Sequence, residues 1–261
     1  MFLVCSKSTR GFFPDISNVK VITGRLNTSI LKEENSQTNV IACGGGTVID
    51  AAKIISKGPI ICYPTTAAGS ACTEHSVIWD GTQKLSIRCD IPNRVIVESS
   101  FLSSIPDSVL FETRVDVVSH CFDSLYSKRS CKESENFIFA ALEILENVNI
   151  STSDLVYAGN LAGKAIQITP TTILHSLSYP LTGRYGVSHG KAMSYFLPQL
   201  SDYKNFEYEK YIKGVFKKVP DNIDIKSCLN ESSSYSKMRD FKFEQEEDVK
   251  SLAKILRLNK I

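Results

Sequence analysis

The stretch NVIACGGGTVIDAAKIIS, residues 39–56, decides which fold the sequence predicts. It opens with a short apolar run at residues 39–42, which is typical of a strand buried on both faces of a parallel sheet. After the glycines, apolar side chains at Val48, Ala51 and Ile55 recur at helical spacing. A strand, a glycine turn and a helix in this order form half of a βαβ unit, so the stretch predicts an α/β fold.

The rest of the chain divides into a strand-rich and a helix-rich half. Other short apolar runs predict further strands at residues 19–23, 59–63, 76–79 and 94–97. We expect the last two of these to pair with each other. No Gly or Pro occurs between Pro106 and Lys128, and helices are predicted at residues 107–128, 132–148, 153–167, 191–197 and 252–258. We therefore predict a parallel-sheet α/β domain at residues 1–103 and an all-α domain at residues 104–261.

Composition excludes several classes of protein. A formal net charge of +2 over 261 residues gives no reason to expect nucleic acid or an anionic membrane as a partner. No apolar run approaches the length of a membrane span, and the N-terminus does not have the pattern of a signal peptide. The eight cysteines form no C-x-x-C pair, which indicates reduced, buried thiols. We therefore expect a cytoplasmic protein.

Two turns that follow predicted strands offer groups for a ligand. Three consecutive glycines, Gly44–Gly46 in one-letter form CGGGT, lie where a helix begins, and backbone N–H groups there can bind a phosphate. The same glycines are also compatible with a tight turn that binds nothing. The next strand is followed by YPTTAAGS, whose hydroxyls at Thr65, Thr66 and Ser70 would lie at the same sheet edge. An ordinary hydroxyl-rich turn is the alternative.

Three of the four histidines suggest a metal site in the helical half. Asp116 and His120 are four residues apart on a predicted helix and share one face, whereas His175 and His189 bracket the segment HSLSYPLTGRYGVSH. Three imidazoles and one carboxylate suit Fe²⁺ or Zn²⁺. Each residue taken alone is equally compatible with a helix-stabilising pair or a hydrogen-bonded core histidine. We expect the fourth histidine, His75, to be exposed or hydrogen-bonded in a loop.

Taken together, these motifs resemble the iron-containing (group III) alcohol dehydrogenases, relatives of dehydroquinate synthase. The matching pieces occur in the family's order over roughly residues 17–200: GGGTVIDAAK, PTTAAGS, IPNRVIVESSFLSSIP, D-x3-H at 116–120 and H-x13-H-G at 175–190. The resemblance implies a dinucleotide-binding sheet domain followed by a helical metal-binding domain, with the active site between them. Fewer residues precede the glycine turn than is usual in the family, which predicts that a strand–helix unit is missing.

The resemblance also implies roles for individual residues. The implied metal ligands are Asp116, His120, His175 and His189. The implied cofactor contacts are Gly24, Gly45, Gly46, Thr47, Asp50, Thr65, Thr66, Ser70, Thr73 and Lys84. Tyr179 stands where many members have another histidine, so we expect proton transfer through Tyr179 or through a bound water in its place. Gly24 replaces a ribose-binding Asp and is followed by Arg25, which is compatible with NADPH as well as NADH.

The implied function is metal-dependent reduction of a small aldehyde to a primary alcohol with NADPH or NADH. The sequence pattern S-Y-P-L-T-x-x-Y-G-x-x-H-G at residues 178–190 resembles that of the phosphonoacetaldehyde reductases, which form 2-hydroxyethylphosphonate. Candidates to hold the phosphonate would then be Arg184, Lys191, Arg88 and Arg114. Each of them taken singly is better explained as an ordinary surface cation. The alternatives are a lyase or cyclase of the dehydroquinate synthase type, and a degenerate nucleotide-binding relative without turnover. The resemblance further implies a homodimer or a larger homo-oligomer.

Overall fold

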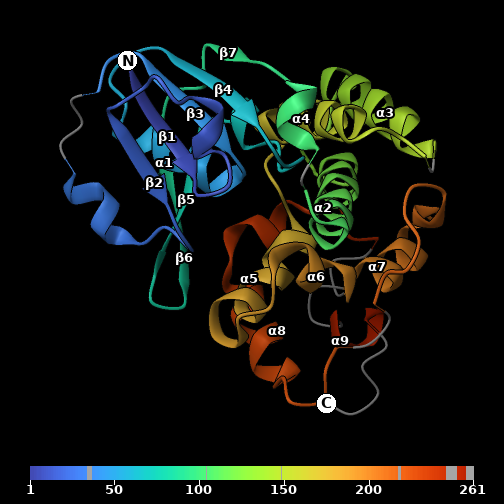
Figure 1. Ribbon diagram of the computed structural model, residues 1–261. Helices are drawn as coiled ribbons and strands as arrows, with labels where there is room; N and C mark the ends of the chain where they lie inside the picture. The colour runs from blue at the N-terminus through green and yellow to red at the C-terminus, as the bar shows by residue number, and fades with distance from the viewer. Residues whose placement is uncertain (34–36, 104, 148, 217–218, 245–251, 257–261) are drawn as a thin grey trace.

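The computed structural model describes the whole chain apart from residues 34–36, 104, 148, 217–218, 245–251 and 257–261. Five strands form a parallel sheet in the order β2-β1-β3-β4-β7 (Figure 1). Their bounds are Phe2–Ser6 for β1, Val19–Ile22 for β2, Val40–Gly44 for β3, Ile60–Pro64 for β4 and Arg94–Val95 for β7. The predicted α/β architecture with a parallel sheet is thus confirmed.

The two faces of the sheet are covered differently. Helix α1 (Gly46–Ile55) packs on one face of the sheet, where Val4 and Ala42 form a hydrophobic core with the apolar side chains of the helix. Leu3 and Cys43 point to the opposite face, because successive side chains of a strand alternate. That face is covered by a cluster of four rings, Phe12, Phe13, Tyr63 and Phe101. The four rings are partly buried, whereas Leu3 beneath them is fully buried, which stabilises the fold by about 1.5–3 kcal/mol.

The strand predictions differ from the structure in two respects. The strand β1 was missed, although it lies inside the sheet with Leu3, Val4 and Cys5 fully buried. The expected pairing of residues 76–79 with 94–97 does not occur. Strand β5 (His75–Asp80) instead forms an antiparallel hairpin with β6 (Gln83–Arg88), because Gly81 allows a tight turn between them at a φ of 57°. Strand β7 pairs in parallel with β4.

The second half of the chain is helical (Figure 1). Its helices are α2 (Asp107–Leu125), α3 (Lys132–Glu146), α4 (Thr152–Ile168), α5 (Ile173–Tyr185), α6 (His189–Ser194), α7 (Leu197–Lys204), α8 (Ile225–Ser234) and α9 (Leu252–Ile255). None of the helices in the described part of the chain has the length and apolar character needed to cross a bilayer.

The helix predictions were confirmed at four places and incomplete at others. The helix expected at residues 191–197 is divided between α6 and α7. Helix α5 was missed because it contains Pro180, and it ends at Gly186 in the left-handed conformation. Helix α8 was also missed. The helix expected at residues 252–258 is described as α9 only over its first residues, and 257–258 lie outside the described residues.

Glycines bring the two halves into close contact. An added Cβ at Gly159 of α4 would lie 2.2 Å from the carbonyl oxygen of Ala67, in the loop that follows β4. One at Gly183 of α5 would lie 2.1 Å from the carbonyl oxygen of Thr82, in the β5–β6 turn. No real Cβ approaches backbone atoms so closely. The hydroxyl-rich loop and the hairpin are therefore held directly against the helices.

We predict that Gly159→Ala lowers the free energy of unfolding by about 1–3 kcal/mol, because the new methyl group collides with the backbone of Ala67. Alanine alone would favour an α-helix by about 1 kcal/mol over glycine, so a net loss identifies the collision. Urea denaturation measures the difference. Gly11→Ala is the control, since nothing lies within 4 Å of a Cβ there. Equal stability of both variants would contradict the close contact.

Candidate metal and dinucleotide site

Helix α2 supplies the first two residues of the candidate metal site. Asp116 and His120 are one helical turn apart, and the His120 Nε2 lies 3.5 Å from the Asp116 Oδ1. Both residues are buried, with 7% and 5% of their surface exposed. The predicted shared face of Asp116 and His120 is therefore present.

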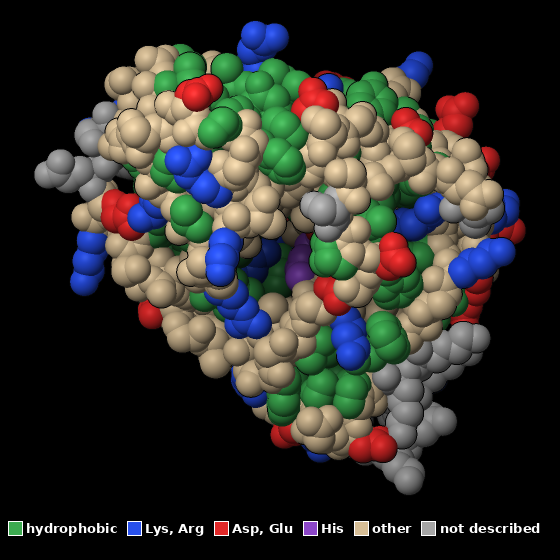
Figure 2. Space-filling model, in the orientation of Figure 1, with side chains coloured by type: hydrophobic (Ala, Val, Ile, Leu, Met, Phe, Trp, Pro, Cys, Tyr) green, Lys and Arg blue, Asp and Glu red, His purple; other side chains and the backbone are tan. Residues whose placement is uncertain are grey.

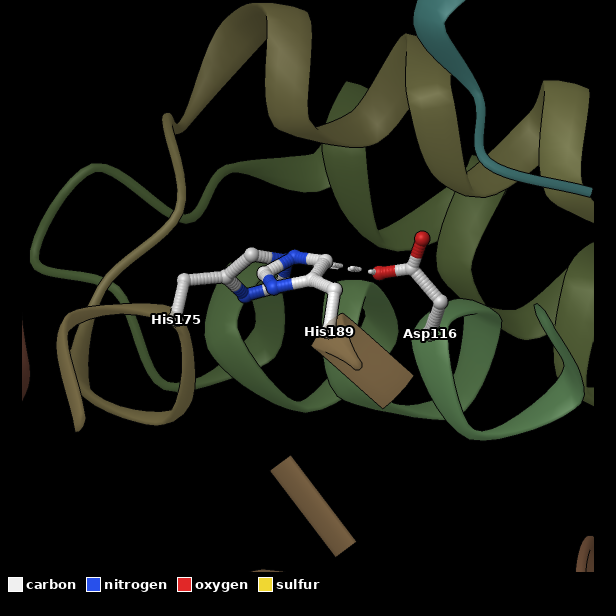
Figure 3. A group of neighbouring side chains, drawn as sticks. All are labelled: Asp116, His175 and His189. Carbon is white, nitrogen blue, oxygen red and sulfur yellow. Dashed lines mark ion pairs between the residues drawn. The ribbon is translucent and has the colours of Figure 1, made fainter. Parts of the chain in front are cut away.

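The other two histidines reach the same carboxylate from different helices (Figure 3). His175 lies in the first turn of α5 and its Nε2 is 3.5 Å from the Asp116 Oδ1. His189 is the first residue of α6 and its Nε2 is 3.9 Å from that oxygen. Ligand atoms of Asp116, His175 and His189 all lie within 4.8 Å of one another, which is the spacing of donors around a single cation.

His120 lies beside this group of three rather than within it. Its ring stacks on that of His175, with centroids 4.6 Å apart and 10° between the planes. The structure thus brings all four predicted ligands together, with Asp116, His175 and His189 as the compact set and His120 adjacent.

The atoms at the centre fit a divalent cation. The Asp116 Oδ1 and the His175 Nε2 are buried and have no hydrogen-bond partner among the described residues. An unsatisfied buried carboxylate oxygen costs several kcal/mol, and a bound cation would remove that cost. Imidazole nitrogens with a carboxylate oxygen suit Fe²⁺ and Zn²⁺.

Burial and charge shift the pKa values of the group: the shifts of His120, His189 and Asp116 favour ligation at neutral pH, whereas that of His175 opposes it. Burial lowers the pKa of His120 to about 4 and that of His189 to about 3, although Asp116 acts against it in both cases. Burial would raise the pKa of Asp116, but the histidines around it, His120 first, outweigh burial and lower that pKa. Burial also opposes the charge on His175, yet Asp116 and Asp123 together raise its pKa to about 9.

The two predicted cofactor loops meet at the carboxyl edge of the sheet. A Cβ on Gly45 would lie 3.2 Å from the Thr66 side chain, and one on Gly46 would lie 3.3 Å from Ala68. Glycine at both places therefore lets the two loops touch. The N–H groups of Gly46 and Thr47 at the start of α1 lie before the first intrahelical hydrogen bonds, which Val48 and Ile49 donate to Gly45. Thr47 is exposed.

Several residues predicted to contact the cofactor are engaged within the protein. The buried Asp50 accepts hydrogen bonds from the Ser70 hydroxyl at 2.5 Å and the Val77 N–H at 3.0 Å. The Thr73 hydroxyl donates to the Ser70 carbonyl oxygen at 3.4 Å, and Thr65 is buried. These side chains fix the loop against α1, so we assign Asp50 a positioning role.

Gly24 and its neighbour Arg25 are explained by the local structure. Gly24 has a φ of 68°, which explains a glycine there. The Arg25 guanidinium lies 4.8 Å from the Trp79 ring centroid and donates to the Thr182 carbonyl oxygen. These contacts tie the sheet to α5, so Arg25 gives no reason to prefer NADPH over NADH.

Tyr179 and Lys84 lie together beside the histidines. The Tyr179 side chain is 4% exposed, and its hydroxyl has no hydrogen-bond partner among the described residues. Its ring is nearly parallel to that of His189, with centroids 6.4 Å apart. The Lys84 Nζ lies 3.9 Å from the centre of the Tyr179 ring. Burial lowers the pKa of Lys84 to about 8, although Asp50 and Asp116 act against it.

The cations predicted to hold a phosphonate are occupied by other contacts. Arg184 donates to the Ser227 hydroxyl at 2.7 Å and pairs with Glu231, both on α8. The Lys191 Nζ lies 5.0 Å from the Phe216 ring, at a surface pocket of about 400 Å³. The ion pair with Glu231 leaves Arg184 less available to a substrate, and the substrate role of both residues stays a prediction.

In Figure 2 a histidine is visible at the bottom of a hollow, with lysine and arginine side chains along one rim.

One residue of the site was missed at the sequence level. Asp123 is fully buried, and its carboxylate accepts a hydrogen bond from the His175 Nδ1 at 2.8 Å. It follows Asp116 by seven residues and His120 by three, so it shares their helix face. That spacing could have revealed it. The exposed His75 lies outside the cluster, as expected.

Comparison with known proteins now assigns the family. The family model described as Fe-containing alcohol dehydrogenase, C-terminal, matches residues 110–244, and the iron-containing alcohol dehydrogenase model matches residues 17–99. The chain belongs to the iron-containing alcohol dehydrogenase family.

Individual members of the family are distant relatives. A 4-hydroxybutyrate dehydrogenase of Clostridium kluyveri is 28% identical over 229 residues, which cover 73% of this chain and 61% of that protein. A phosphonoacetaldehyde reductase of Streptomyces viridochromogenes is 27% identical over 208 residues, which cover 63% and 53%. The chain thus spans between about half and three fifths of the length of these relatives.

Solved structures of iron-containing alcohol dehydrogenases share the fold. The crystal structure of one such enzyme has a TM-score of 0.80 at 20% identity, with 98% of this chain and 91% of the other covered. A sulfoacetaldehyde reductase from Bifidobacterium kashiwanohense, in complex with NAD⁺, gives 0.80 at 18% identity, with 98% and 89% covered. The predicted combination of sheet and helical halves is therefore confirmed as a fold of this family.

We predict that His189→Ala abolishes tight binding of Zn²⁺ or Fe²⁺, because it removes one of the three atoms of the compact set. The loss should exceed the about 10–100-fold that removal of an outer hydrogen-bond partner costs. Calorimetric titration and metal analysis of the purified protein measure it. His75→Ala removes an exposed histidine outside the cluster and should bind metal like the wild type. Unchanged affinity in His189→Ala would contradict the site.

We also predict that metal binding releases a proton at neutral pH. His175, with a pKa of about 9, is protonated at pH 7 and must lose its proton to act as a ligand. The apparent affinity should therefore rise about tenfold per pH unit up to pH 9 and then level off. Calorimetry in buffers of different ionisation enthalpy counts the released protons. An affinity that stays constant between pH 7 and 9 would contradict the charge assigned to His175.

Proposed function

We propose that the protein is a metal-dependent oxidoreductase that reduces a small aldehyde to a primary alcohol with NADH or NADPH. The observation that carries this proposal is the convergence of Asp116, His175 and His189 on one point, in a chain of the iron-containing alcohol dehydrogenase family. The parallel-sheet half would act as a cofactor domain at residues 1–103, and the helical half as a metal domain at residues 104–261.

The metal would be Fe²⁺ or Zn²⁺, held by Asp116, His120, His175 and His189. A divalent cation supplies a Lewis acid that polarises a carbonyl oxygen. The chain's own contribution is a dry and rigid setting, because the carboxylate and two of the imidazoles are almost fully buried. A buried site strengthens the electrostatic stabilisation of charge that develops on the substrate oxygen.

The cofactor would bind along the edge where the two loops meet. The backbone N–H groups of Gly45, Gly46 and Thr47 at the start of α1 suit a pyrophosphate. Thr66 faces the same glycines from the second loop. A bound reduced nicotinamide supplies the hydride, and the protein orients it.

Tyr179 would donate the proton that completes the alcohol. Its hydroxyl is buried and has no partner among the described residues, and its ring lies against His189. The Lys84 ammonium above the ring face stabilises negative charge on the ring when the proton leaves. These contacts support a tyrosine in the place of the histidine that many family members carry.

We further propose that the aldehyde carries an anionic group, with phosphonoacetaldehyde as the first candidate. A phosphonoacetaldehyde reductase and a 4-hydroxybutyrate dehydrogenase are among the relatives, and both names denote anionic substrates. Arg184 is paired with Glu231. Lys84 lies over the Tyr179 ring, so its positive charge could attract the anionic group of the substrate.

The proposal predicts that the protein, loaded with Fe²⁺ or Zn²⁺, oxidises NADH or NADPH in the presence of an aldehyde. The absorbance of the reduced nicotinamide follows the reaction. Phosphonoacetaldehyde and uncharged aldehydes of similar size should be compared, with both cofactors. Faster turnover of the anionic aldehyde would support the substrate class. Cofactor binding without consumption of any aldehyde would contradict the oxidoreductase assignment and support a relative without turnover.

We predict that Tyr179→Phe lowers kcat by about 10²–10⁴-fold, which is the usual contribution of a general acid. Phenylalanine keeps the ring that packs on His189, so metal affinity should not change. Tyr157→Phe removes the hydroxyl of an exposed tyrosine on α4 and serves as the matched control. A variant Tyr179→Phe with the kcat of Tyr157→Phe would exclude Tyr179 as the proton donor.

A further inference from the structure

Asp123 is a buried charge that the proposed chemistry does not use. It lies on α2, has no exposed surface, and has no cationic Lys or Arg partner among the described residues. A buried carboxylate is costly unless it is paired or receives several hydrogen bonds. The contacts that offset this cost show what the residue is for.

Among the described residues, the hydrogen bonds to the Asp123 carboxylate all come from the beginning of α5. Its Oδ1 accepts hydrogen bonds from the Leu174 N–H at 3.0 Å and the Thr172 hydroxyl at 3.0 Å. Its Oδ2 accepts from the Thr172 N–H at 2.8 Å and the His175 N–H at 3.3 Å. The side chain of Thr172, the N-cap residue of α5, makes no capping hydrogen bond, so Asp123 caps this helix from α2.

The remaining contact reaches the imidazole of His175. The Oδ2 of Asp123 lies 2.8 Å from the His175 Nδ1, which must carry a proton to make this hydrogen bond. The other ring nitrogen, Nε2, is then the one with a lone pair when the ring is neutral. That nitrogen faces Asp116 and has no hydrogen-bond partner among the described residues.

We propose that Asp123 is a positioning residue of the metal site, which sets the tautomer and the orientation of His175. This inference rests on the proposed function, because it requires that the Nε2 of His175 bind a cation. A carboxylate hydrogen-bonded to a ligating imidazole fixes the ring and increases its basicity, and its loss typically costs about 10–100-fold in metal affinity.

Helix capping alone is the competing explanation, and it has a different geometry. The cap uses four donors of Thr172, Leu174 and the His175 backbone. The fifth contact, to the His175 side chain, contributes nothing to capping. A purely structural Asp123 would change stability when replaced, without a specific change at the His175 ring.

The test compares Asp123→Asn and Asp123→Glu with the wild type, with Zn²⁺ and Co²⁺ as the probes. We expect Asp123→Asn to weaken binding of both ions by about 10–100-fold, because one amide oxygen cannot replace two carboxylate oxygens. Asp123→Glu restores the charge and should recover part of the affinity. In the Zn²⁺-loaded protein, the ¹H resonance of the His175 Nδ1–H should move upfield in Asp123→Asn, since a neutral acceptor forms a weaker hydrogen bond.

The control variant is Thr172→Val, which removes the hydroxyl that donates to Asp123 but leaves the Nδ1 contact in place. It should lower the free energy of unfolding while the metal affinity and the Nδ1–H resonance stay at their wild-type values. With only four histidines in the chain, His175→Asn suffices to assign that resonance. If Asp123→Asn does not fold, Asp123→Glu carries the test, because a longer side chain must displace the ring or the cap.

The outcomes separate a failure of the proposed function from a failure of the positioning role of Asp123. Weak metal binding by the wild-type protein itself would contradict the proposed function. Tight binding by the wild type, together with an unchanged affinity and an unchanged Nδ1–H resonance in both Asp123 variants, would overturn the positioning role and leave the proposed function intact. Loss of affinity and an altered resonance in an Asp123 variant, absent in Thr172→Val, would support the inference.

Discussion

The structure of the helical half depends on one buried carboxylate that is surrounded by three imidazoles. Asp116 sits where α2, α5 and α6 meet, and its Oδ1 lies within 3.9 Å of an Nε2 on each of His120, His175 and His189. A buried charge of this kind is costly unless opposite charge accompanies it. Helix α2 and the consecutive helices α5 and α6, which follow later in the sequence, are therefore arranged around a place where a cation would be stabilised.

Glycine makes this convergence possible, because the helices must approach one another more closely than side chains allow. Gly190 follows His189 directly, and an added Cβ there would lie 2.3 Å from the Glu112 carbonyl oxygen. The start of α6 thus packs on the backbone of α2, and His189 reaches Asp116. Gly159 and Gly183 have the same effect between the halves, and they hold the Ala67 loop and the β5–β6 hairpin near the histidines.

Local sequence patterns predicted part of the metal site more reliably than they predicted the helices and strands around it. Asp116 and His120 share a helix face whatever the tertiary structure, so their proximity followed from spacing alone. The approach of His175 and His189 is long-range and came from the family resemblance. The ion pair of Arg184 with Glu231 could not be predicted, because Glu231 lies on α8, a helix that periodicity did not reveal. Strand β1 is as short and apolar as the strands that were predicted, but the apolar start of the chain was considered only as a possible signal peptide.

The connection between the first two strands of the sheet contains no α-helix among the described residues. Strands β1 and β2 are both present, and the described chain between them forms only a 3-10 turn at Arg10–Phe12. A parallel sheet needs cover on both faces, and on this face aromatic rings supply it in place of a helix. The two loops proposed to bind the cofactor follow β3 and β4, on the face covered by α1. Their geometry depends on Gly45, Gly46 and the Asp50–Ser70 hydrogen bond, none of which involves the connection between β1 and β2.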